Sequence, residues 1–426
     1  MNPLTRATTP PGGPSSALAR FLLPAASPAD GEYVFAAFAS RWRSIRKGTD
    51  EAGPADAVRR VDRPASASVV EVLRSLIRER GRHTGHAFRK HNTVVPVQPL
   101  EVNMQSATNQ TKAADEPWSV FHPMAPQDRI VVDQMRAVTE PNKGKLRGIA
   151  ARAPFDAIMA RVVAPDGVTF RRDAVGGIAG WWCEPTDAVP GAVILHAHGG
   201  WFNWGSSDAF RHLVGHISRS ARARSFVPDY RLAPENPFPA ALNDMNACYQ
   251  GLVASGVKSI ALTGDSAGGN LALVLLALIA AQSSAHRVAV AAVALSPVTD
   301  LAMEGPSWES RANADPYFVR DQAEELIRSY LDGRDPSDPA VSPLYGSLAG
   351  LPPIRVHVGD AEVLLDDSLR YAERAVAAGV DAKVDVWEGM PHGFLSGVGQ
   401  LEASNQALGA IGTFLSMQFA GVRAGP

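Results

Sequence analysis

The sequence predicts an α/β protein built on a mostly parallel sheet. From about residue 167 onward, short apolar runs rich in β-branched residues alternate with longer helical stretches. Strands that alternate with helices of this length are typical of βαβ units, and no repeat of fixed period is evident. The expected strands are Val168–Ala174, Ile178–Cys183, Ala192–Ala197, Ser225–Asp229, Ser259–Gly264, Val288–Leu295, Ile354–Gly359 and Ala382–Trp387. The main helices expected between and after them are Leu271–Ala281, Gln322–Leu331 and Asp367–Ala378.

Composition sets broad limits on the class of protein. With 46% hydrophobic and 20% charged residues in 426, the chain has enough apolar material for a large core. A net charge of −2 offers no general electrostatic reason to bind nucleic acid. The two cysteines exclude a disulfide scaffold and a cysteine-rich zinc module. The longest apolar run, Leu271–Ala281, is about half of a membrane span, so we expect no stable membrane insertion and a cytoplasmic location.

The first part of the chain differs from the rest. Residues 1–103 are rich in Pro, Ala, Ser and Arg and hold 15 Lys and Arg against 9 Asp and Glu. We expect a poorly ordered basic extension without a catalytic role. Its three histidines, His83, His86 and His91, have no carboxylate or cysteine that completes a metal site, so no metal is expected there. Residues 118–139 predict short helices that carry aromatic and aliphatic anchors.

The strongest chemical signal is the pentapeptide Gly264-Asp265-Ser266-Ala267-Gly268. It lies between an apolar strand and an apolar helix, which is the setting of a strained turn that exposes a nucleophilic serine. The small residues are needed because a larger side chain at either glycine would collide with neighbouring backbone. The turn would present Ser266 at the carboxyl end of the sheet, where ligands bind in open α/β folds.

A second signal is the loop His198-Gly199-Gly200-Trp201, which follows a predicted strand. Acyl transfer needs backbone N–H donors aimed at the oxygen that becomes negative in the transition state. The N–H groups of Gly199, Gly200 and Ala267 are the expected donors of this oxyanion hole, with Trp201 as a further candidate. We expect His198 to shape the loop rather than to transfer protons.

A serine hydroxyl needs a histidine base that is oriented by a carboxylate. Two histidines after Ser266, His286 and His392, are considered as the base. His392 is preferred, because it lies in a loop between a strand and the terminal helix. Asp360 and Glu362 both follow the strand Ile354–Gly359, and periodicity does not distinguish them as the acid. No phosphate-binding loop or dinucleotide fingerprint is present, so no cofactor is implied.

Four ordered motifs resemble those of the hormone-sensitive-lipase family of α/β-hydrolases, which includes bacterial carboxylesterases. The motifs are His198-Gly199-Gly200, Asp229-Tyr230-Arg231-Leu232-Ala233-Pro234-Glu235, Gly264-Asp265-Ser266-Ala267-Gly268-Gly269 and Pro391-His392-Gly393-Phe394. In that family the acid lies thirty residues before the histidine, which implies Glu362 here, with Asp360 as the alternative. Trp201 stands where the family commonly has a third glycine. We expect the Asp229–Glu235 motif to be structural, with Arg231 paired to Glu235.

The resemblance also implies a helical cap over the site. Residues 104–165 would supply its N-terminal helices, and an insertion at about 301–345 would complete it within a catalytic domain at 166–420. Trp201, Phe202 and Phe394 would line the substrate pocket, and Tyr317 and Phe318 would help to close it.

The expected function is that of a cofactor-free serine carboxylesterase for short- to medium-chain acyl esters. Ser266, Glu362 and His392 would be its catalytic residues. The same triad also cleaves lactones and small amides, so these substrates are alternatives. From a different class, the fold resembles plant gibberellin receptors, which bind a small ligand without turnover. The partner is then a small-molecule ester, and a homodimer through an exposed sheet edge is compatible with the pattern.

Overall fold

A computed structural model describes residues 116–282 and 288–421 of the chain. The expectations for the extension 1–103, its histidines and His286 therefore lie outside the described residues. The described residues form a nine-stranded sheet in the order β1-β9-β8-β7-β6-β4-β5-β3-β2. Its strands are β1 Ser119–His122, β2 Val168–Val175, β3 Ile178–Pro185, β4 Ala192–Ala197, β5 Arg224–Pro228, β6 Ser259–Asp265, β7 Ala289–Leu295, β8 Ile354–Gly359 and β9 Ala382–Trp387.

Neighbouring strands are parallel from β1 to β5 in this order. The two antiparallel pairs are β5 with β3 and β3 with β2. This arrangement confirms the predicted α/β fold with a mostly parallel sheet. The eight strands expected from the sequence are all present, with bounds that differ by two residues at most. Parallel strands end at the same edge of a sheet, so the loops after β4, β6, β7, β8 and β9 gather there.

The prediction of helices over residues 118–139 was partly wrong. Ser119–His122 forms the edge strand β1, parallel to β9, and the helix α4 covers only Pro126–Thr139. The imidazole of His122 stacks on Trp387, with ring centroids 3.9 Å apart, and its Nε2 bonds Asp385 Oδ1 at 2.7 Å. These contacts join residues more than 260 positions apart. Tertiary packing therefore makes a strand of four residues whose local sequence carries no strand pattern.

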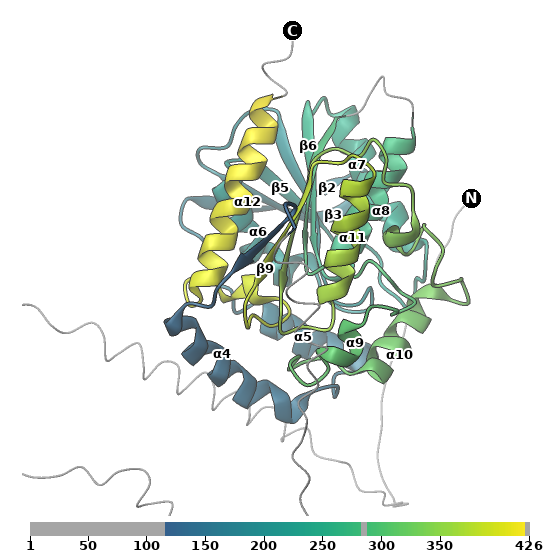
Figure 1. The fold of residues 1–426 in the computed structure, drawn as a ribbon. Helices are drawn as coiled ribbons and strands as arrows, with labels where there is room; N and C mark the ends of the chain where they lie inside the picture. The colour runs from purple at the N-terminus through teal and green to yellow at the C-terminus, as the bar shows by residue number, and fades with distance from the viewer. Residues whose placement is uncertain (1–115, 283–287, 422–426) are drawn as a thin grey trace, which may run out of the picture. The chain divides into compact units, whose positions relative to one another are not determined.

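Helices cover both faces of the sheet (Figure 1). On one face lie α6 (Ser207–Ala221) and α12 (Glu402–Gly421), and on the other lie α7 (Ala240–Ala254), α8 (Ala267–Ala281) and α11 (Leu365–Ala377). Helix α8 is apolar along almost its whole length because it is buried beneath its neighbours, with Leu271 and Leu275 both fully buried. Within the described ranges, no helix has both the length and the apolar character that a membrane crossing requires.

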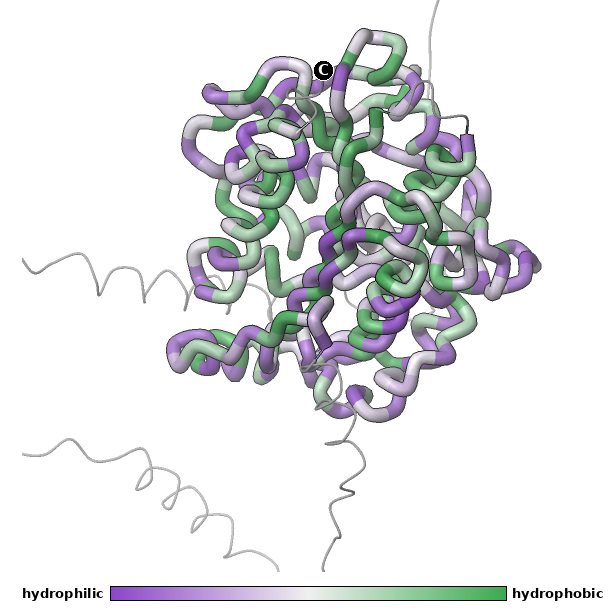
Figure 2. Tube along the Cα trace, turned by 45° about the horizontal axis from the view of Figure 1, so that its top comes forward, coloured by the Kyte–Doolittle hydropathy of each residue, from purple (hydrophilic) through white to green (hydrophobic). Residues whose placement is uncertain are grey.

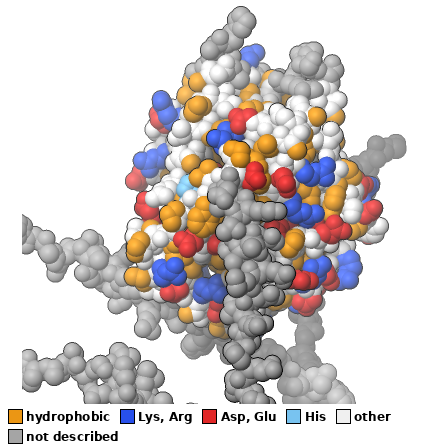
Figure 3. Space-filling model, in the orientation of Figure 1, with side chains coloured by type: hydrophobic (Ala, Val, Ile, Leu, Met, Phe, Trp, Pro, Cys, Tyr) orange, Lys and Arg blue, Asp and Glu red, His pale blue; other side chains and the backbone are white. Residues whose placement is uncertain are grey.

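Polar residues are distributed over the outside of the described chain. Hydrophobic stretches run through the interior in Figure 2, whereas α4 carries many hydrophilic residues. On the face shown in Figure 3, acidic and basic side chains are interspersed, which agrees with a net charge of −2. Such a surface presents no extended region of one sign on that face.

Several helices lie together at one end of the sheet (Figure 1). They are α4, α5 (Arg152–Met159), α9 (Ser307–Ser310) and α10 (Arg320–Leu331). Hydrogen bonds join the chain before β2 to the insertion between β7 and β8. Gln322 Nε2 donates to Leu146 O at 2.6 Å, and Lys143 Nζ donates to Asp315 O at 2.6 Å. The two segments that the sequence assigned to a cap are therefore in contact.

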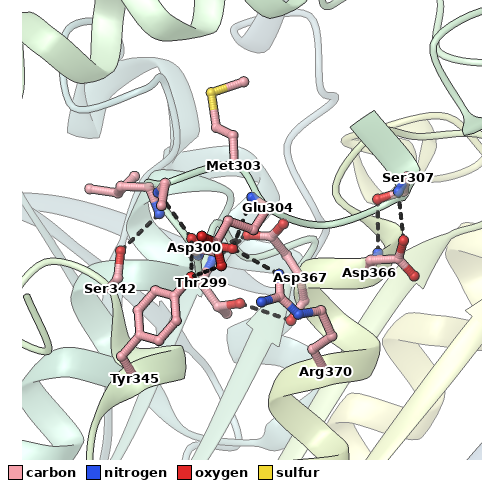
Figure 4. A network of polar contacts seen from close by, with 12 residues as sticks. Thr299, Asp300, Met303, Glu304, Ser307, Ser342, Tyr345, Asp366, Asp367 and Arg370 are labelled. Atoms are coloured by element: carbon pink, nitrogen blue, oxygen red, sulfur yellow. Dashed lines mark hydrogen bonds and ion pairs between the residues drawn. The ribbon is translucent and has the colours of Figure 1, made fainter. Parts of the chain in front are cut away.

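A buried polar network attaches the insertion to the first turns of α11 (Figure 4). Asp367 Oδ2 accepts the N–H groups of Thr299 and Asp300 at 2.7 and 2.9 Å. The Asp300 carboxylate pairs with Arg370 at 2.7 Å and accepts the Tyr345 hydroxyl at 3.0 Å. Burial raises the pKa of Asp367 to about 8, and the neighbouring Asp300 carboxylate adds to the rise. Asp367 therefore holds its proton more tightly in the folded protein than in the unfolded chain.

This proton predicts how stability depends on pH. Between about pH 4 and pH 8 the folded protein holds a proton on Asp367 that the unfolded chain has released. Stability is then lost as pH rises through this window, at up to about 1.4 kcal/mol per pH unit for one proton. Asp367→Asn mimics the protonated acid, so the variant should gain stability over the wild type as pH rises from 5 to 8.5.

Urea unfolding of both proteins at the two pH values measures this difference. Asp366→Asn is the matched control, since Asp366 also accepts a backbone N–H, from Ser307 at 2.6 Å, on a half-buried side chain. The control should keep the pH dependence of the wild type. An unchanged pH dependence in Asp367→Asn would show that the residue is ionised in the folded protein.

Candidate active site

Ser266 lies in a tight turn between β6 and α8, with a backbone φ of 55°. A positive φ is uncommon for a residue other than glycine, and such strain is concentrated at functional sites. The turn needs glycine on the helix side, because a Cβ at Gly268 would lie 2.0 Å from the carbonyl oxygen of Ala197. The backbone N–H of Ser266 donates to Leu295 O at 2.8 Å and anchors the turn to β7. The structure therefore has the strand–turn–helix geometry expected from the pentapeptide.

The loop after β4 approaches the same turn. Gly199 donates its N–H to Asp265 Oδ1 at 3.1 Å. This bond occupies one of the expected oxyanion donors and does not support the expectation for Gly199. Among the described residues, the N–H groups of Gly200, Trp201 and Ala267 have no hydrogen-bond acceptor. Ala267 begins α8, so its N–H lies at the positive end of the helix dipole.

His198 is a buried residue of this loop. Its ring stacks on Tyr230, with centroids 4.2 Å apart, and the Tyr230 hydroxyl donates to the carbonyl oxygen of His198 at 2.7 Å. Burial lowers the pKa of His198 to about 4. A neutral, fully packed imidazole agrees with the expectation that His198 shapes the loop.

His392 and Glu362 form the central polar contact of the site. His392 follows β9 and Glu362 follows β8, and His392 Nδ1 lies 2.6 Å from Glu362 Oε2. The other carboxylate oxygen, Oε1, accepts the Ser296 hydroxyl and the Gly359 N–H, each at 2.7 Å. Glu362 is fully buried, so these three partners replace the water that the carboxylate has lost.

The charge of the carboxylate determines the basicity of the imidazole. Burial alone would lower the pKa of His392, but the hydrogen-bonded Glu362 carboxylate and the more weakly acting neighbouring carboxylates together raise it above its ordinary value. Asp315 and Asp265 contribute smaller rises. The contact through Nδ1 leaves Nε2 to face a substrate or a nucleophile.

Asp360, the alternative acid, bonds to the backbone of the loop that follows β9. Its Oδ1 accepts the N–H of Gly389 at 2.5 Å, and its own N–H donates to Trp387 O at 3.0 Å. These bonds hold the loop that carries His392. That loop passes very close to β8, since a Cβ at Gly359 would lie 1.9 Å from Met390 O. Of the two acids left open by the sequence, Glu362 is the one that contacts His392.

Ser296 is a site residue that sequence reasoning missed. It follows β7 directly, has a φ of 45°, and is buried. Its hydroxyl bonds Glu362, while Leu295 just before it accepts the Ser266 N–H. The end of β7 therefore links the Ser266 turn to the Glu362–His392 pair. The available signal was its position, a serine at the carboxyl end of a strand next to the nucleophile strand.

Ser266 and His392 lie at the same edge of the sheet, at the ends of β6 and β9. The Ser266 hydroxyl makes no hydrogen bond to any of the described residues. Catalytic hydrogen bonds are often long without substrate and tighten when it binds.

The aromatic residues expected in the pocket are largely core residues. Phe202 stacks on Tyr330 with centroids 3.7 Å apart, and Phe394 packs 5.8 Å from Trp387 in the cluster beneath α12. Both are fully buried, which does not support the substrate-contact expectation for them. Trp201 is also buried, but its ring meets Phe318 edge-on at 5.3 Å. Phe318 in turn lies 5.0 Å from the His392 ring.

The expected ion pair within the Asp229–Glu235 motif was wrong. Arg231 Nη2 bonds Asp244 Oδ1 at 2.8 Å, and Glu235 pairs with Arg152 at 2.6 Å. The motif thus reaches α7 on one side and α5 on the other, so it is held from two helices. Among residues 116–282 and 288–421, no cluster of His, Cys, Asp and Glu side chains is arranged to hold a metal ion.

Comparison with known proteins shows which family this chain resembles. A family model described as the alpha/beta hydrolase fold matches residues 194–396. An acetyl-hydrolase of Streptomyces hygroscopicus is 36% identical over 220 residues, which is 51% of this chain and 73% of the relative. An esterase of Mycobacterium tuberculosis, LipU, is 32% identical over 305 residues, which is 69% of this chain and 95% of the relative.

Solved structures agree with these relatives. The crystal structure of an esterase from the bacterial hormone-sensitive lipase family has a TM-score of 0.63 and 36% identity, and the match covers 69% of this chain and 98% of that one. A hormone-sensitive lipase from a metagenome library has a TM-score of 0.64 and 32% identity, with 70% and 99% coverage. The chain belongs to the α/β-hydrolases, and within them to the family of bacterial hormone-sensitive-lipase-like esterases.

The Ser266 turn gives a direct test of the local geometry. Gly268→Ala places a methyl group against the Ala197 carbonyl and should destabilise the protein by about 3 kcal/mol or more. Gly409→Ala is the matched control, because Gly409 is exposed on α12 and a Cβ there meets no atom within 4 Å. The control should gain about 0.5–1 kcal/mol of helix stability. Thermal unfolding of both variants measures the contrast, and equal stability would contradict the close approach at Gly268.

Proposed function

We propose that this carboxylic ester hydrolase is a serine carboxylesterase in which Ser266 is the nucleophile, His392 the general base and acid, and Glu362 the orienting acid. The observation that carries the proposal is the buried contact between His392 Nδ1 and Glu362 Oε2 at 2.6 Å, at the same edge of the sheet as Ser266, whose backbone φ is positive. A carboxylate on Nδ1 keeps the other imidazole nitrogen available to accept the serine proton.

The reaction proceeds in two halves. Ser266 Oγ attacks the ester carbonyl while His392 Nε2 takes its proton, and the imidazolium then protonates the departing alcohol. Water next attacks the acyl-serine, again losing its proton to His392, and the acid leaves as Ser266 is restored. Glu362 orients the imidazole and stabilises the imidazolium that forms in each half.

The oxyanion hole consists, in this proposal, of the N–H groups of Gly200, Trp201 and Ala267. These groups lack acceptors among the described residues and come from the two loops that flank Ser266. Each well-aimed donor contributes about 3–4 kcal/mol to stabilising the tetrahedral intermediate. Trp201 takes part through its backbone, so a bulky residue can stand where a glycine is common in the family.

We propose short- to medium-chain acyl esters as substrates. The supporting feature is the aromatic packing around the loop, where Phe318 and Trp308 lie 5.3 and 6.3 Å from the buried ring of Trp201. Large side chains at this place would limit the length of the acyl group that the site accepts. The segments 116–165 and 301–345, which contact one another, serve as the cap that excludes water.

Two further assignments are proposals of the same kind. We place the protein in the cytoplasm because both of its cysteines, Cys183 and Cys248, are buried free thiols. We assign homodimer formation to the sheet edge at β1, where Val120 and Phe121 are 41% and 43% exposed. An uncovered strand edge is a template for pairing with a second copy.

A panel of p-nitrophenyl esters from acetate to palmitate tests the function. Wild-type protein should be most active on the short and medium chains, and Ser266→Ala should lose at least about a thousandfold in kcat while it keeps the wild-type melting temperature. The control variant Asp338→Asn, on the surface of the insertion, should retain full activity. Undiminished hydrolysis in Ser266→Ala would contradict the proposed nucleophile, and inactivity of the folded wild type on every ester would contradict the substrate class.

A further inference from the structure

Asp315 is a buried carboxylate in the insertion between β7 and β8, just before α10. Its side chain is almost completely buried, and both oxygens are used. Oδ1 accepts the N–H groups of Tyr317 and Phe318 at 2.7 and 3.0 Å, and Oδ2 accepts the N–H of Val363 at 3.0 Å. The first two donors belong to the insertion and the third follows the catalytic acid directly. Asp315 therefore joins the insertion to the loop that carries Glu362.

One end of this bridge contacts the proposed base, and the other end directly follows Glu362 in the sequence. The ring of Phe318 lies edge-on to the His392 imidazole, with centroids 5.0 Å apart and an interplanar angle of 69°. The same ring meets Trp201 at 5.3 Å and 87°, on the loop that supplies the proposed oxyanion donors. Phe318 therefore contacts both the imidazole of His392 and a side chain of that loop.

We propose that Asp315 is a positioning residue of the esterase reaction, which holds Phe318 against His392 and fixes the backbone beside Glu362. This inference rests on the proposed function, since it assigns a role in the reaction of Ser266 and His392. Other carboxylates of the insertion lack this geometry. Asp338, for example, accepts the N–H of Ala340 at 2.9 Å within its own loop.

The charge of Asp315 also raises the pKa of His392, which is an effect that can be measured. Three carboxylates face His392: Glu362 from the loop after β8, Asp265 from the end of β6, and Asp315 from the insertion. Each raises the pKa of His392 against the lowering effect of burial. Around Asp315 itself, burial raises its pKa, while the three backbone donors and His392 oppose the rise. The phenol of Tyr317 is also nearby, and the Lys143 ammonium binds the backbone oxygen of Asp315.

Removal of the Asp315 charge should therefore change both kcat and the pH dependence of kcat/KM. In Asp315→Asn, an amide nitrogen cannot accept the hydrogen bond that one of the carboxylate oxygens accepts, so one side of the bridge is lost. We expect kcat for p-nitrophenyl acetate to fall about tenfold or more, because misplacement by about 1 Å can cost about a hundredfold. The acidic limb of the kcat/KM profile, which reports the pKa of the free base, should move to lower pH.

Two further variants separate position from charge. Phe318→Leu removes the ring but no charge, so it should lower kcat and leave the acidic limb where the wild type has it. Asp338→Asn removes a carboxylate with a backbone acceptor role in the same insertion, so it should change neither quantity. Melting temperatures of all variants are measured alongside, and wild-type activity is the reference that separates this inference from the proposed function.

The outcomes divide as follows. An inactive wild type would overturn the proposed function itself. With an active wild type, a folded Asp315→Asn that keeps both the wild-type kcat and the wild-type limb would overturn the role of Asp315 alone. A shifted limb without any loss of kcat would overturn positioning, because charge would then be the whole effect. Should Asp315→Asn fail to fold, a Phe318→Leu variant with unchanged kcat would overturn the bridge.

Discussion

The contact between Glu362 and His392 is the interaction on which the rest of the site depends. A carboxylate without solvent exposure is costly unless every lone pair finds a partner, and removal of one member of such a pair typically costs about 3–5 kcal/mol. Here the partners are His392, the Ser296 hydroxyl and the Gly359 N–H. Satisfying the carboxylate therefore requires the ends of β7, β8 and β9 to lie side by side, which only the parallel order of these strands provides.

The insertion between β7 and β8 is attached to this same place. Its bonds to the β8–α11 region come from Asp300, Ser307 and Asp315, which reach Asp367, Asp366 and Val363 in turn. The base of the insertion and the acid loop thus form one unit, and a change at either is transmitted to the other through short polar contacts. Caps that choose substrates must be near the chemistry, and this attachment places Phe318 against the imidazole.

Much of the fold and two of the three proposed catalytic residues could be predicted from the sequence, because their signals are local. The sheet followed from alternating apolar runs, and Ser266 and His392 followed from a small-residue turn and a glycine-rich loop at strand ends. Glu362 could not be separated from Asp360 by periodicity, since both follow β8 and only the path of the His392 loop decides which one meets the imidazole. The same limit explains Gly199 and Ser296. Their roles depend on side chains such as Asp265 and Glu362, which are distant in sequence and brought near by the sheet. Phe202 and Phe394 were expected at the pocket because of their motif neighbours, yet apolar burial decides their place.

Reaction with a fluorophosphonate tests the central claim most directly, because only an activated serine attacks such a probe at a useful rate. The full chain is incubated with the probe, its intact mass is measured, and the modified peptide is mapped. The account predicts one adduct per chain, on Ser266, and essentially no adduct in folded His392→Ala. A folded wild type that stays unmodified, or an adduct that maps to another residue, would contradict it.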